Sequence, residues 1–411
     1  MPQPPHRGAP PVDYPIRPIT PGEAKQFFTS NAIAFGHDPR PEDGIASTLA
    51  YADLSRSISV WDGDQVVGTA GTWTFEVTTP GGFVPCGGLT WVGVLPSHRR
   101  RGVLTSMMRY QLDQVRDRGE AIAALWASEA IIYQRFGYGM AAEGVEMTID
   151  HTRTALRTAP PFSGRTRYIE RDEALARFPA IWDEARRVYP GMHNRTPGWW
   201  EHRVLRVPPW PSPPGYSSLF TVVYEEEGKP LGYTRYRVKE EWPQGVPAST
   251  LDVQALVANT DAAYSALWQH IFGVDLIEKI HADWRPVDEP LYAMLADPRR
   301  LLRRPSDSLW VRIVDTPRAL AARKYATSGE LVIELRDEFC PWNAGRYALQ
   351  GGPAGAQCFQ TTKEPDLTMT VNELGALYLG GMRAHASSAS ASLVFTMRSA
   401  VTPHSSARSQ P

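Results

Sequence analysis

The stretch of residues 91–105 constrains the possible fold more than any other part of the chain. It reads Trp-Val-Gly-Val-Leu-Pro-Ser-His-Arg-Arg-Arg-Gly-Val-Leu-Thr. An apolar run of strand length ends at Pro96, and past Gly102 the apolar residues recur at helical spacing. These apolar positions are Leu104, Met108, Leu112 and Val115. The pattern predicts a strand, a tight turn and a helix in direct succession.

Three arginines, at positions 99–101, stand immediately before the predicted helix. Cations at a helix N-terminus oppose the positive end of the helix dipole, so stability alone does not favour them. The free backbone N–H groups of a first helical turn, with Gly102 allowing close approach, suit a pyrophosphate. Arginine adds forked donors to such a group. A solvated basic turn is the alternative, but the strand before it and the helix after it favour a phosphate site.

This segment resembles motif A of the GNAT acetyltransferases, in which a strand, an Arg-x-x-Gly-x-small turn and a helix hold the pyrophosphate of acetyl-CoA. Leu104 stands where glycine or alanine is commoner. That departure points to one branch, the Eis-like (enhanced intracellular survival) acetyltransferases. Residues 96–104, the triplet Ala127-Ser-Glu129 and the run Tyr-Gln-Arg-Phe-Gly-Tyr-Gly at 133–139 resemble that branch in the same order.

The resemblance and the order of predicted elements imply a mixed fold of α/β and α+β classes. We expect tandem GNAT folds, the second degenerate, followed by a domain similar to sterol carrier protein. The expected boundaries are a loose arm at 1–13, a catalytic GNAT domain at 14–150, a degenerate GNAT-like domain at 165–300, a sterol-carrier-like domain at 307–384 and a divergent Ser/Ala-rich tail at 385–411.

Several local expectations follow from the same pattern. The strand at 145–149 should close the first domain, and the strand at 309–314 should open the third. The pair Gly87-Gly88 predicts a bulge or a hairpin turn. In the second copy, Asn259 and Asp261 should cap the helix, and no arginine or glycine faces a phosphate there.

Composition and charge exclude several classes of function. The 43 basic and 44 acidic residues leave a net charge of −1, so no bulk field attracts nucleic acid or an anionic membrane. The three cysteines form no Cys-x-x-Cys pair, which argues against a zinc site or a disulfide framework, and we expect no metal. No run of 18 apolar residues or signal-peptide core is present, so we expect no membrane span and a cytoplasmic location.

Acetyl transfer from acetyl-CoA, the expected co-substrate, needs a held donor, a polarised carbonyl and a proton for the departing thiolate. The strand residues Val92, Gly93 and Val94 are expected to offer backbone N–H groups to the thioester and pantetheine. The predicted phosphate-binding residues are Arg100, Arg101, Gly102, Val103, Leu104 and Thr105, and Ser128 and Glu129 should lie beside the donor.

Tyr133 is the expected general acid, a role that the Eis-like resemblance implies. Its phenol can protonate a thiolate only if it is well positioned or if nearby cations lower its pKa. The alternative is a packed aromatic, which is how we interpret Tyr138.

The acceptor side is less specified by sequence. The resemblance implies a wide, acidic, aromatic pocket for a polyamine, an aminoglycoside-like amine or a lysine side chain. Phe35, His37, Asp38 and Trp91 are candidates for its wall. Eis-like enzymes also resemble one another in forming hexamers, so a homo-oligomer is expected.

Eis-like enzymes use their own C-terminal carboxylate as the base. Residues 385–411 contain no Asp or Glu and end at Pro411, so the role is not carried over to this chain. We expect weakened activity as a result. The alternative function is a catalytically impaired binding protein that holds a lipid or partner through its C-terminal domain.

Overall fold

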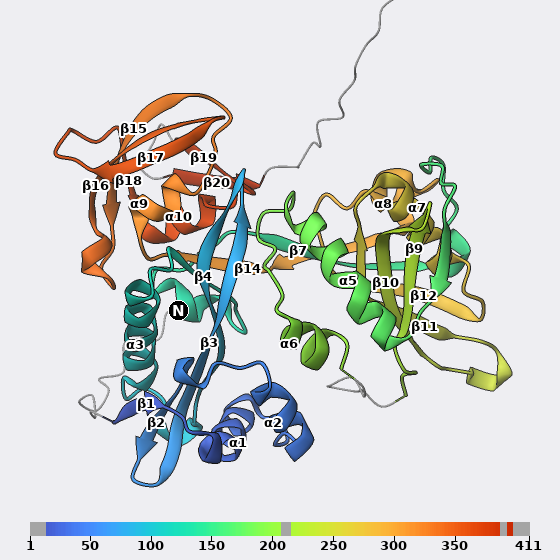
Figure 1. The fold of residues 1–411 in the computed structure, drawn as a ribbon, viewed down its shortest axis with the longest axis horizontal. Coiled ribbons are helices and arrows are strands. Elements are labelled where there is room, and N and C mark those ends of the chain that lie inside the picture. The colour runs from blue at the N-terminus through green and yellow to red at the C-terminus, as the bar shows by residue number, and fades with distance from the viewer. Residues whose placement is uncertain (1–13, 207–214, 387–392, 398–411) are drawn as a thin grey trace, which may run out of the picture. The chain divides into compact units, whose positions relative to one another are not determined.

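The computed structural model describes residues 14–206, 215–386 and 393–397, which form two compact units (Figure 1). The first unit comprises residues 14–139, 169–206 and 309–375, and the second comprises residues 140–168, 215–308 and the described residues from 376 onward. The arm at 1–13 and most of the tail lie outside the described residues. None of the described helices is both long enough and apolar enough to cross a membrane.

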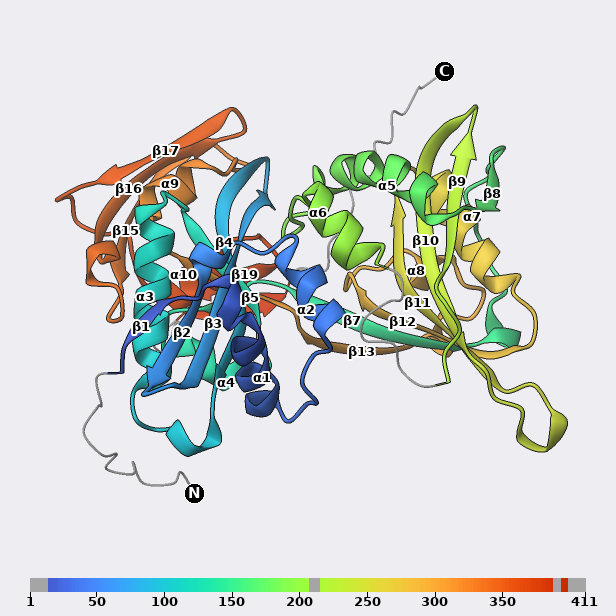
Figure 2. The ribbon, with the colours of Figure 1, turned by 60° about the horizontal axis from the view of Figure 1, so that its bottom comes forward.

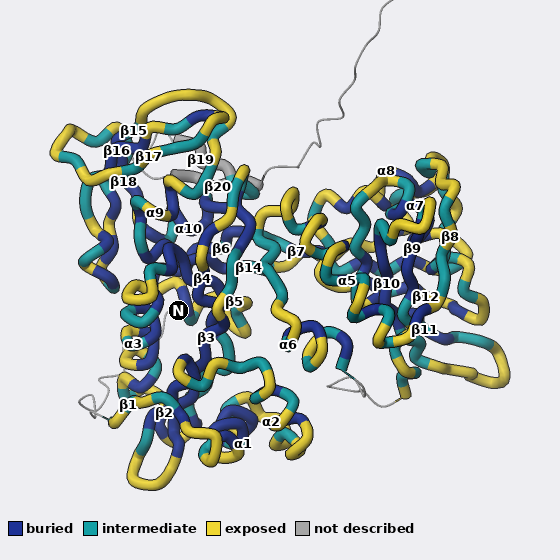
Figure 3. Tube along the Cα trace, in the orientation of Figure 1, coloured by how far each residue is buried: buried dark blue, intermediate teal, exposed yellow. Residues whose placement is uncertain are grey.

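A seven-stranded sheet forms the centre of the first unit, in the order β1-β2-β3-β4-β5-β14-β6. Its strands are β1 (Ile16–Pro18), β2 (Ser57–Asp62), β3 (Gln65–Thr79), β4 (Gly82–Val94), β5 (Ile122–Trp126), β14 (Leu309–Ile313) and β6 (Gly139–Met140). β5 lies parallel to β4, as the sequence predicts. Most of β3 is buried (Figure 3), so the sheet carries a core on both faces.

Two helices pack on opposite faces of this sheet (Figure 2). A Cβ on Gly68 would meet Val103 of α3 (Val103–Asp117), whereas a Cβ on Gly93 would meet Ala34 of α1 (Ala24–Phe35). Gly68 and Gly93 belong to successive residue pairs of β3 and β4, and successive pairs point to opposite faces of a sheet. The sheet is therefore covered on both sides at the end of β4, where the turn with the three arginines at 99–101 (the arginine turn) begins.

The first unit contains further helices. They are α2 (Glu42–Leu49), α4 (Ala130–Gln134), α5 (Arg171–Arg186), α6 (Pro197–Trp199) and α9 (Thr316–Ala321). A capping box precedes α1, because the carboxylate of Glu23 accepts a hydrogen bond from the Thr20 backbone N–H at 2.8 Å.

The double glycine in β4 is neither a bulge nor a turn. Gly87 and Gly88 pair regularly with β3 on one side and with β5 on the other. A Cβ on Gly88 would lie 2.5 Å from the Phe75 ring, so the glycine makes room for an aromatic side chain. The bulge of β4 occurs further along, at Trp91 and Val92.

The second unit contains another seven-stranded sheet, in the order β13-β7-β12-β11-β10-β9-β8. Its elements are β7 (Glu143–Asp150), β8 (Arg165–Tyr168), β9 (Phe220–Glu226), β10 (Lys229–Lys239), β11 (Ser249–Ala258), α7 (Asp261–Phe272), β12 (Ile277–Arg285), α8 (Leu291–Met294) and β13 (Leu302–Asp307). The succession β11-α7-β12 repeats β4-α3-β5, with the two strands again parallel. Thr260 caps α7, because its hydroxyl accepts a hydrogen bond from the Ala263 backbone N–H. The predicted caps, Asn259 and Asp261, do not have this role.

Two strands lie in a different sheet from the one expected. Residues 145–149 belong to β7, which pairs with β12 and β13 in the second sheet, so the expectation that they close the first domain is wrong. The place beside β5 is taken by β14, which was expected to open the third domain. Both strands contain apolar and β-branched residues, and pairing partners so distant in sequence leave no local signal.

A four-stranded sheet in the order β17-β16-β15-β18 forms most of the expected third region. Its elements are β15 (Gly329–Arg336), β16 (Gly345–Gly352), β17 (Gly355–Gln360), β18 (Leu367–Thr370) and the following α10 (Val371–Leu377). Within the expected tail, β20 (Leu393–Met397) pairs with β19 (Met382–Ala386). This part of the chain therefore has a regular strand pairing.

Candidate active site

The sheet of the first unit opens between β4 and β5. The last parallel pair in the described chain joins Gly88 to Ala124, although β4 continues to Val94. The edge of β4 from residue 89 onward therefore has backbone groups that no longer pair with β5. A ligand amide or carbonyl can pair with such an edge.

A β-bulge rotates one peptide group of this edge, the one between Trp91 and Val92. Trp91 and Val92 together face a single residue of β3, and Trp91 has a φ of 54°. The Trp91 carbonyl oxygen accepts hydrogen bonds from Asn31 Nδ2 at 2.9 Å and from Thr69 Oγ1 at 2.8 Å. Both side chains are buried. The carbonyl is therefore held toward α1 and β3.

The opposite end of that peptide is the Val92 N–H. In a trans peptide the N–H points away from the preceding carbonyl, so the Val92 N–H points away from β3, toward the side on which β5 has separated. A carbonyl oxygen placed there would meet a fixed donor. This arrangement suits charge that develops on a thioester oxygen.

Close packing against α1 explains why residue 93 is a glycine. A Cβ at this position would lie 3.0 Å from Ala34 and 3.2 Å from Asn31 Nδ2, both on α1. The missing side chain therefore allows α1 to approach β4. The backbone of Gly93 remains part of the open edge.

The arginine turn joins β4 to α3. Gly102 has a φ of 84° and precedes α3 without any side chain capping it, and Arg100 also has positive φ (65°). Arg99 donates to the Ala34 carbonyl and Arg101 donates to the Tyr14 hydroxyl. Arg100 is exposed and forms no hydrogen bond or ion pair with another described residue. The first-turn amides from Val103 to Thr105 thus stand beside an unengaged guanidinium, which fits a diphosphate.

His98 shapes this turn. Its Nε2 lies 3.0 Å from Asp62 Oδ2 and its Nδ1 lies 2.9 Å from Ser97 Oγ. Both ring nitrogens are therefore engaged within the protein.

Tyr133 lies on α4, after β5. Its side chain is buried, yet its hydroxyl forms no hydrogen bond with any described residue. Burial raises the pKa of Tyr133 to about 12, and no cation lowers it. Tyr138, 5.9 Å away between ring centroids, is fully buried, with its hydroxyl also unpaired. Ser128 and Glu129 are exposed at the start of α4.

An aromatic cluster surrounds Trp91 and was not predicted as a group. The rings of Tyr51, Trp73, Trp91 and Trp199 define it, and the Trp73 and Trp91 centroids lie 4.7 Å apart. Trp199 comes from α6, more than 100 positions along the chain, so only the fold brings it here. Phe35 and His37 stack on each other at 6.3 Å on the exposed end of α1, and Asp38 is exposed.

Profiles of known families cover most of the chain. A GNAT acetyltransferase domain matches residues 15–141, a second GNAT acetyltransferase domain matches residues 191–313, and a sterol carrier protein domain matches residues 316–402. The last match passes the boundary expected at residue 384, so the first part of the Ser/Ala-rich segment belongs to this domain.

Individual relatives agree with these profiles. An uncharacterized N-acetyltransferase of Streptomyces avermitilis is 43% identical over 371 residues, 89% of this chain and 90% of that protein. The N-acetyltransferase Eis of Mycobacterium tuberculosis is 35% identical over 332 residues, 78% of each chain. The chain belongs to the Eis-like N-acetyltransferases of the GNAT superfamily. The crystal structure of Eis1 from Mycobacterium abscessus is similar to this Eis-like enzyme, with a TM-score of 0.76, 33% identity and coverage of 89% and 90%. The predicted family, tandem GNAT fold and sterol-carrier-like domain are confirmed.

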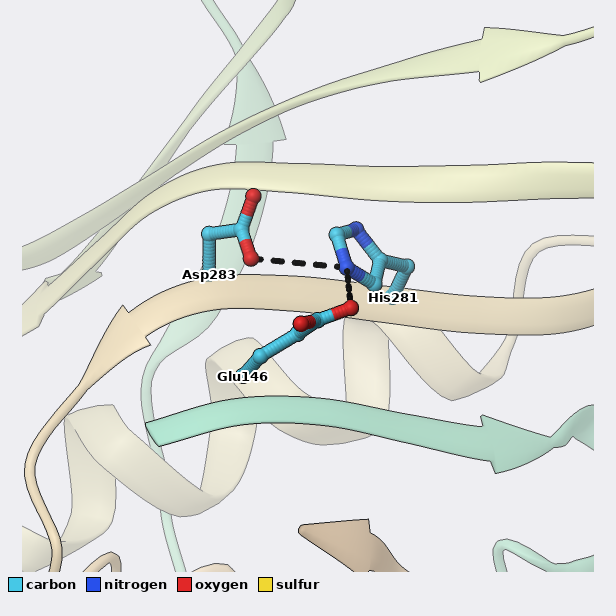
Figure 4. A group of neighbouring side chains, drawn as sticks. All are labelled: Glu146, His281 and Asp283. Carbon is cyan, nitrogen blue, oxygen red and sulfur yellow. Dashed lines mark hydrogen bonds and ion pairs between the residues drawn. The ribbon is translucent and has the colours of Figure 1, made fainter. Parts of the chain in front are cut away.

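The second unit of this Eis-like acetyltransferase carries a cluster with metal-ligand chemistry. Ligand atoms of Glu146, His281 and Asp283 all lie within 4.8 Å of one another (Figure 4). His281 Nε2 faces both carboxylates, and Nδ1 lies 3.1 Å from buried Asp252. Arg237 and Arg304 approach the same carboxylates. A protonated His281 with these two arginines balances the three acids, so the cluster forms a complete ion-pair network.

We expect the stability of this network to depend on pH through His281. The hydrogen bond to Asp252, the charges of Asp283 and Asp252 and a weaker hydrogen bond to Glu146 raise its pKa from 6.5 to about 9, although burial opposes the shift. The stabilisation is therefore complete below pH 6.5 and is lost as the pH rises through about 9. Thermal unfolding should show a larger gap between wild type and His281→Gln at pH 6 than at pH 9.5. A gap that does not change with pH would contradict the raised pKa.

Proposed function

We propose that this enzyme transfers the acetyl group of acetyl-CoA to a primary amine at the open edge of β4. The observation that carries the proposal is the rotated peptide group between Trp91 and Val92. It lies on the strand that leads, through the turn with the three arginines, into α3, a helix whose N-terminus no side chain caps. One motif thereby offers a donor for the thioester oxygen and a site for the diphosphate.

Donor binding would use mostly backbone groups. Val92 to Val94 would pair with the pantetheine amides, the amides of Gly102, Val103, Leu104 and Thr105 would hold the diphosphate, and Arg100 and Arg101 would add charge. Arg101 is already oriented by Tyr14, whereas Arg100 is free to move onto a phosphate. Ser128 and Glu129 would face the donor from the start of α4.

Tyr133 would act on the departing sulfur. The absence of a hydrogen bond from its hydroxyl to any described residue leaves the donor available to a ligand. With a pKa near 12, the phenol stays protonated at neutral pH, as an acid must. The acceptor amine would lie on the opposite side of the thioester, against the aromatic cluster.

The test of the proposal is binding followed by turnover. Acetyl-CoA should raise the melting temperature, and thiol release should appear with a panel of amines. Arg100→Ala combined with Gly102→Asp should weaken acetyl-CoA binding by roughly 10–100-fold, since it removes one cation and adds an anion beside the diphosphate. The positive φ of Gly102 costs a substituted residue roughly 1–2 kcal/mol, and aspartate is among the few residues that adopt this conformation, so the variant is expected to fold.

Gly63→Asp is the matched control. Gly63 also has positive φ, 57°, with open space around it, but lies in the hairpin between β2 and β3. It should leave the acetyl-CoA shift unchanged. An undiminished shift in the Arg100/Gly102 variant would place the donor elsewhere.

The resemblance of the sequence to Eis-like enzymes implies a homo-oligomer. We also propose a hexamer, which mass photometry of the full chain tests directly. A monomer at working concentration would contradict it.

A further inference from the structure

Two guanidinium groups lie at the borders of the aromatic cluster of Tyr51, Trp73, Trp91 and Trp199. The Cζ of Arg40 is 4.9 Å from the centroid of the Phe28 ring, which in turn lies 5.2 Å from the Trp91 ring. The Cζ of Arg203 is 4.9 Å from the Trp199 ring, and Arg203 is close enough to Arg40 for its charge to act on it. Both positive charges therefore border the place proposed for the acceptor.

Neither charge has a counter-ion within the described chain. Arg40 is partly buried, and its one hydrogen bond goes from Nη1 to the neutral hydroxyl of Thr48, at 3.1 Å. Arg203 contacts the Trp199 ring and no carboxylate. Arg206 differs, since it pairs with Asp43 at 2.7 Å. The cluster border thus carries two uncompensated positive charges.

The environment makes this arrangement costly for Arg40. Burial lowers the pKa of Arg40, Tyr51 offsets part of this shift, and the charges of Arg203 and Arg206 lower the pKa further. A cation removed from water and repelled by like charges is stabilised strongly by any anion that reaches it. A polycationic acceptor would add to the repulsion.

We propose that the acceptor of this enzyme is a primary amine that also carries an anionic group, a carboxylate or a phosphate, bound by Arg40 and Arg203. The inference rests on the proposed acetyl transfer at Val92. The aromatic rings contact the carbon chain between the two ends, and the arginines hold the anion so that the amine lies at the thioester. This specificity differs from the polyamine or aminoglycoside-like acceptor that the family resemblance implies.

The experiment compares amines that differ in one group. Acetylation of 6-aminohexanoate, hexane-1-amine, 3-aminopropyl phosphate and spermidine is measured on the full-length enzyme. In wild type, kcat/KM for the better of the two anionic amines should exceed that for hexane-1-amine and for spermidine by about tenfold or more. In Arg40→Gln combined with Arg203→Gln, this preference should fall to within about twofold, while hexane-1-amine is affected little.

Arg109→Gln is the matched control, because the Cζ of Arg109 also lies over a ring, 4.6 Å from Phe339, on the exposed side of α3. It should keep the preference for anionic amines. A loss shared equally by all four amines in the Arg40/Arg203 variant would mean that the arginines only stabilise the fold. A wild-type preference for spermidine would also overturn the proposal.

Binding provides a readout that is independent of turnover. Calorimetry with CoA present should show that hexanoate binds the wild type and binds the Arg40/Arg203 variant about tenfold more weakly. If acetyl-CoA neither binds nor reacts, the proposed function fails, yet hexanoate titrated without CoA still tests the arginines. Equal hexanoate affinity in wild type and variant refutes the anion site whatever the activity.

Discussion

Replacing Tyr133 with phenylalanine is expected to lower kcat by about 10³-fold, which corresponds to about 4 kcal/mol of transition-state stabilisation. Burial raises the pKa of the phenol to about 12, whereas a thiol has a pKa near 8.5. Full proton transfer to a free thiolate is therefore unfavourable. The phenol is expected to donate a hydrogen bond to the departing sulfur and to pass its proton on as the amine's proton replaces it.

The pH dependence follows from the direction of this shift. Because the pKa rises, ionisation of Tyr133 contributes no loss of kcat at pH 6–10, and any alkaline limb from this residue appears near pH 12. Acetyl-CoA binding should be unchanged in the variant, since the phenol acts after binding.

Tyr138→Phe is the matched control for Tyr133→Phe. The Tyr138 hydroxyl is buried without a partner, so its removal should leave kcat within twofold and should stabilise the fold by about 1 kcal/mol. Similar kcat values for Tyr133→Phe and wild type would remove Tyr133 from the mechanism.

The second large effect is expected from two residues that would not touch the substrate. Asn31→Leu combined with Thr69→Val removes both hydrogen bonds to the Trp91 carbonyl. The peptide is then free to rotate, and the Val92 N–H loses its fixed direction. Removal of one oxyanion donor typically costs about 10²–10³ in rate, and we expect a loss of kcat of about 10²-fold.

Comparison of kinetic constants separates this positioning role from a structural one. A positioning role predicts that kcat falls while acetyl-CoA affinity changes by less than about threefold, because the diphosphate site is intact. Thr69→Ser keeps the hydroxyl and should retain most activity. Thr78→Val, at another buried threonine of β3 whose hydroxyl has no partner, is the control for the strand. A folded Asn31/Thr69 variant with nearly wild-type kcat would exclude the turned peptide as the donor.

The sequence by itself determined the elements that depend on local patterns. The run from Trp91 to Thr105 contains its strand, its proline break and its helix within 15 residues, so periodicity and turn chemistry suffice to locate it. The same holds for α7, the helix that was expected to begin near Asp261. The family resemblance rests on these same local blocks.

Only the tertiary structure decided which distant segments meet. The exchange of β7 and β14 between the sheets joins strands more than 100 positions apart, and each strand carries apolar residues that either sheet could bury. Likewise, Asn31 and Thr69 are ordinary polar residues on a helix and a strand until the bulge presents the Trp91 carbonyl to them. The positions of Arg40 and Arg203 indicate a role only because the fold brings these residues next to the rings of Phe28 and Trp199. Hydrogen-bond partners and uncompensated charges are properties of three-dimensional neighbours, and sequence spacing does not contain them.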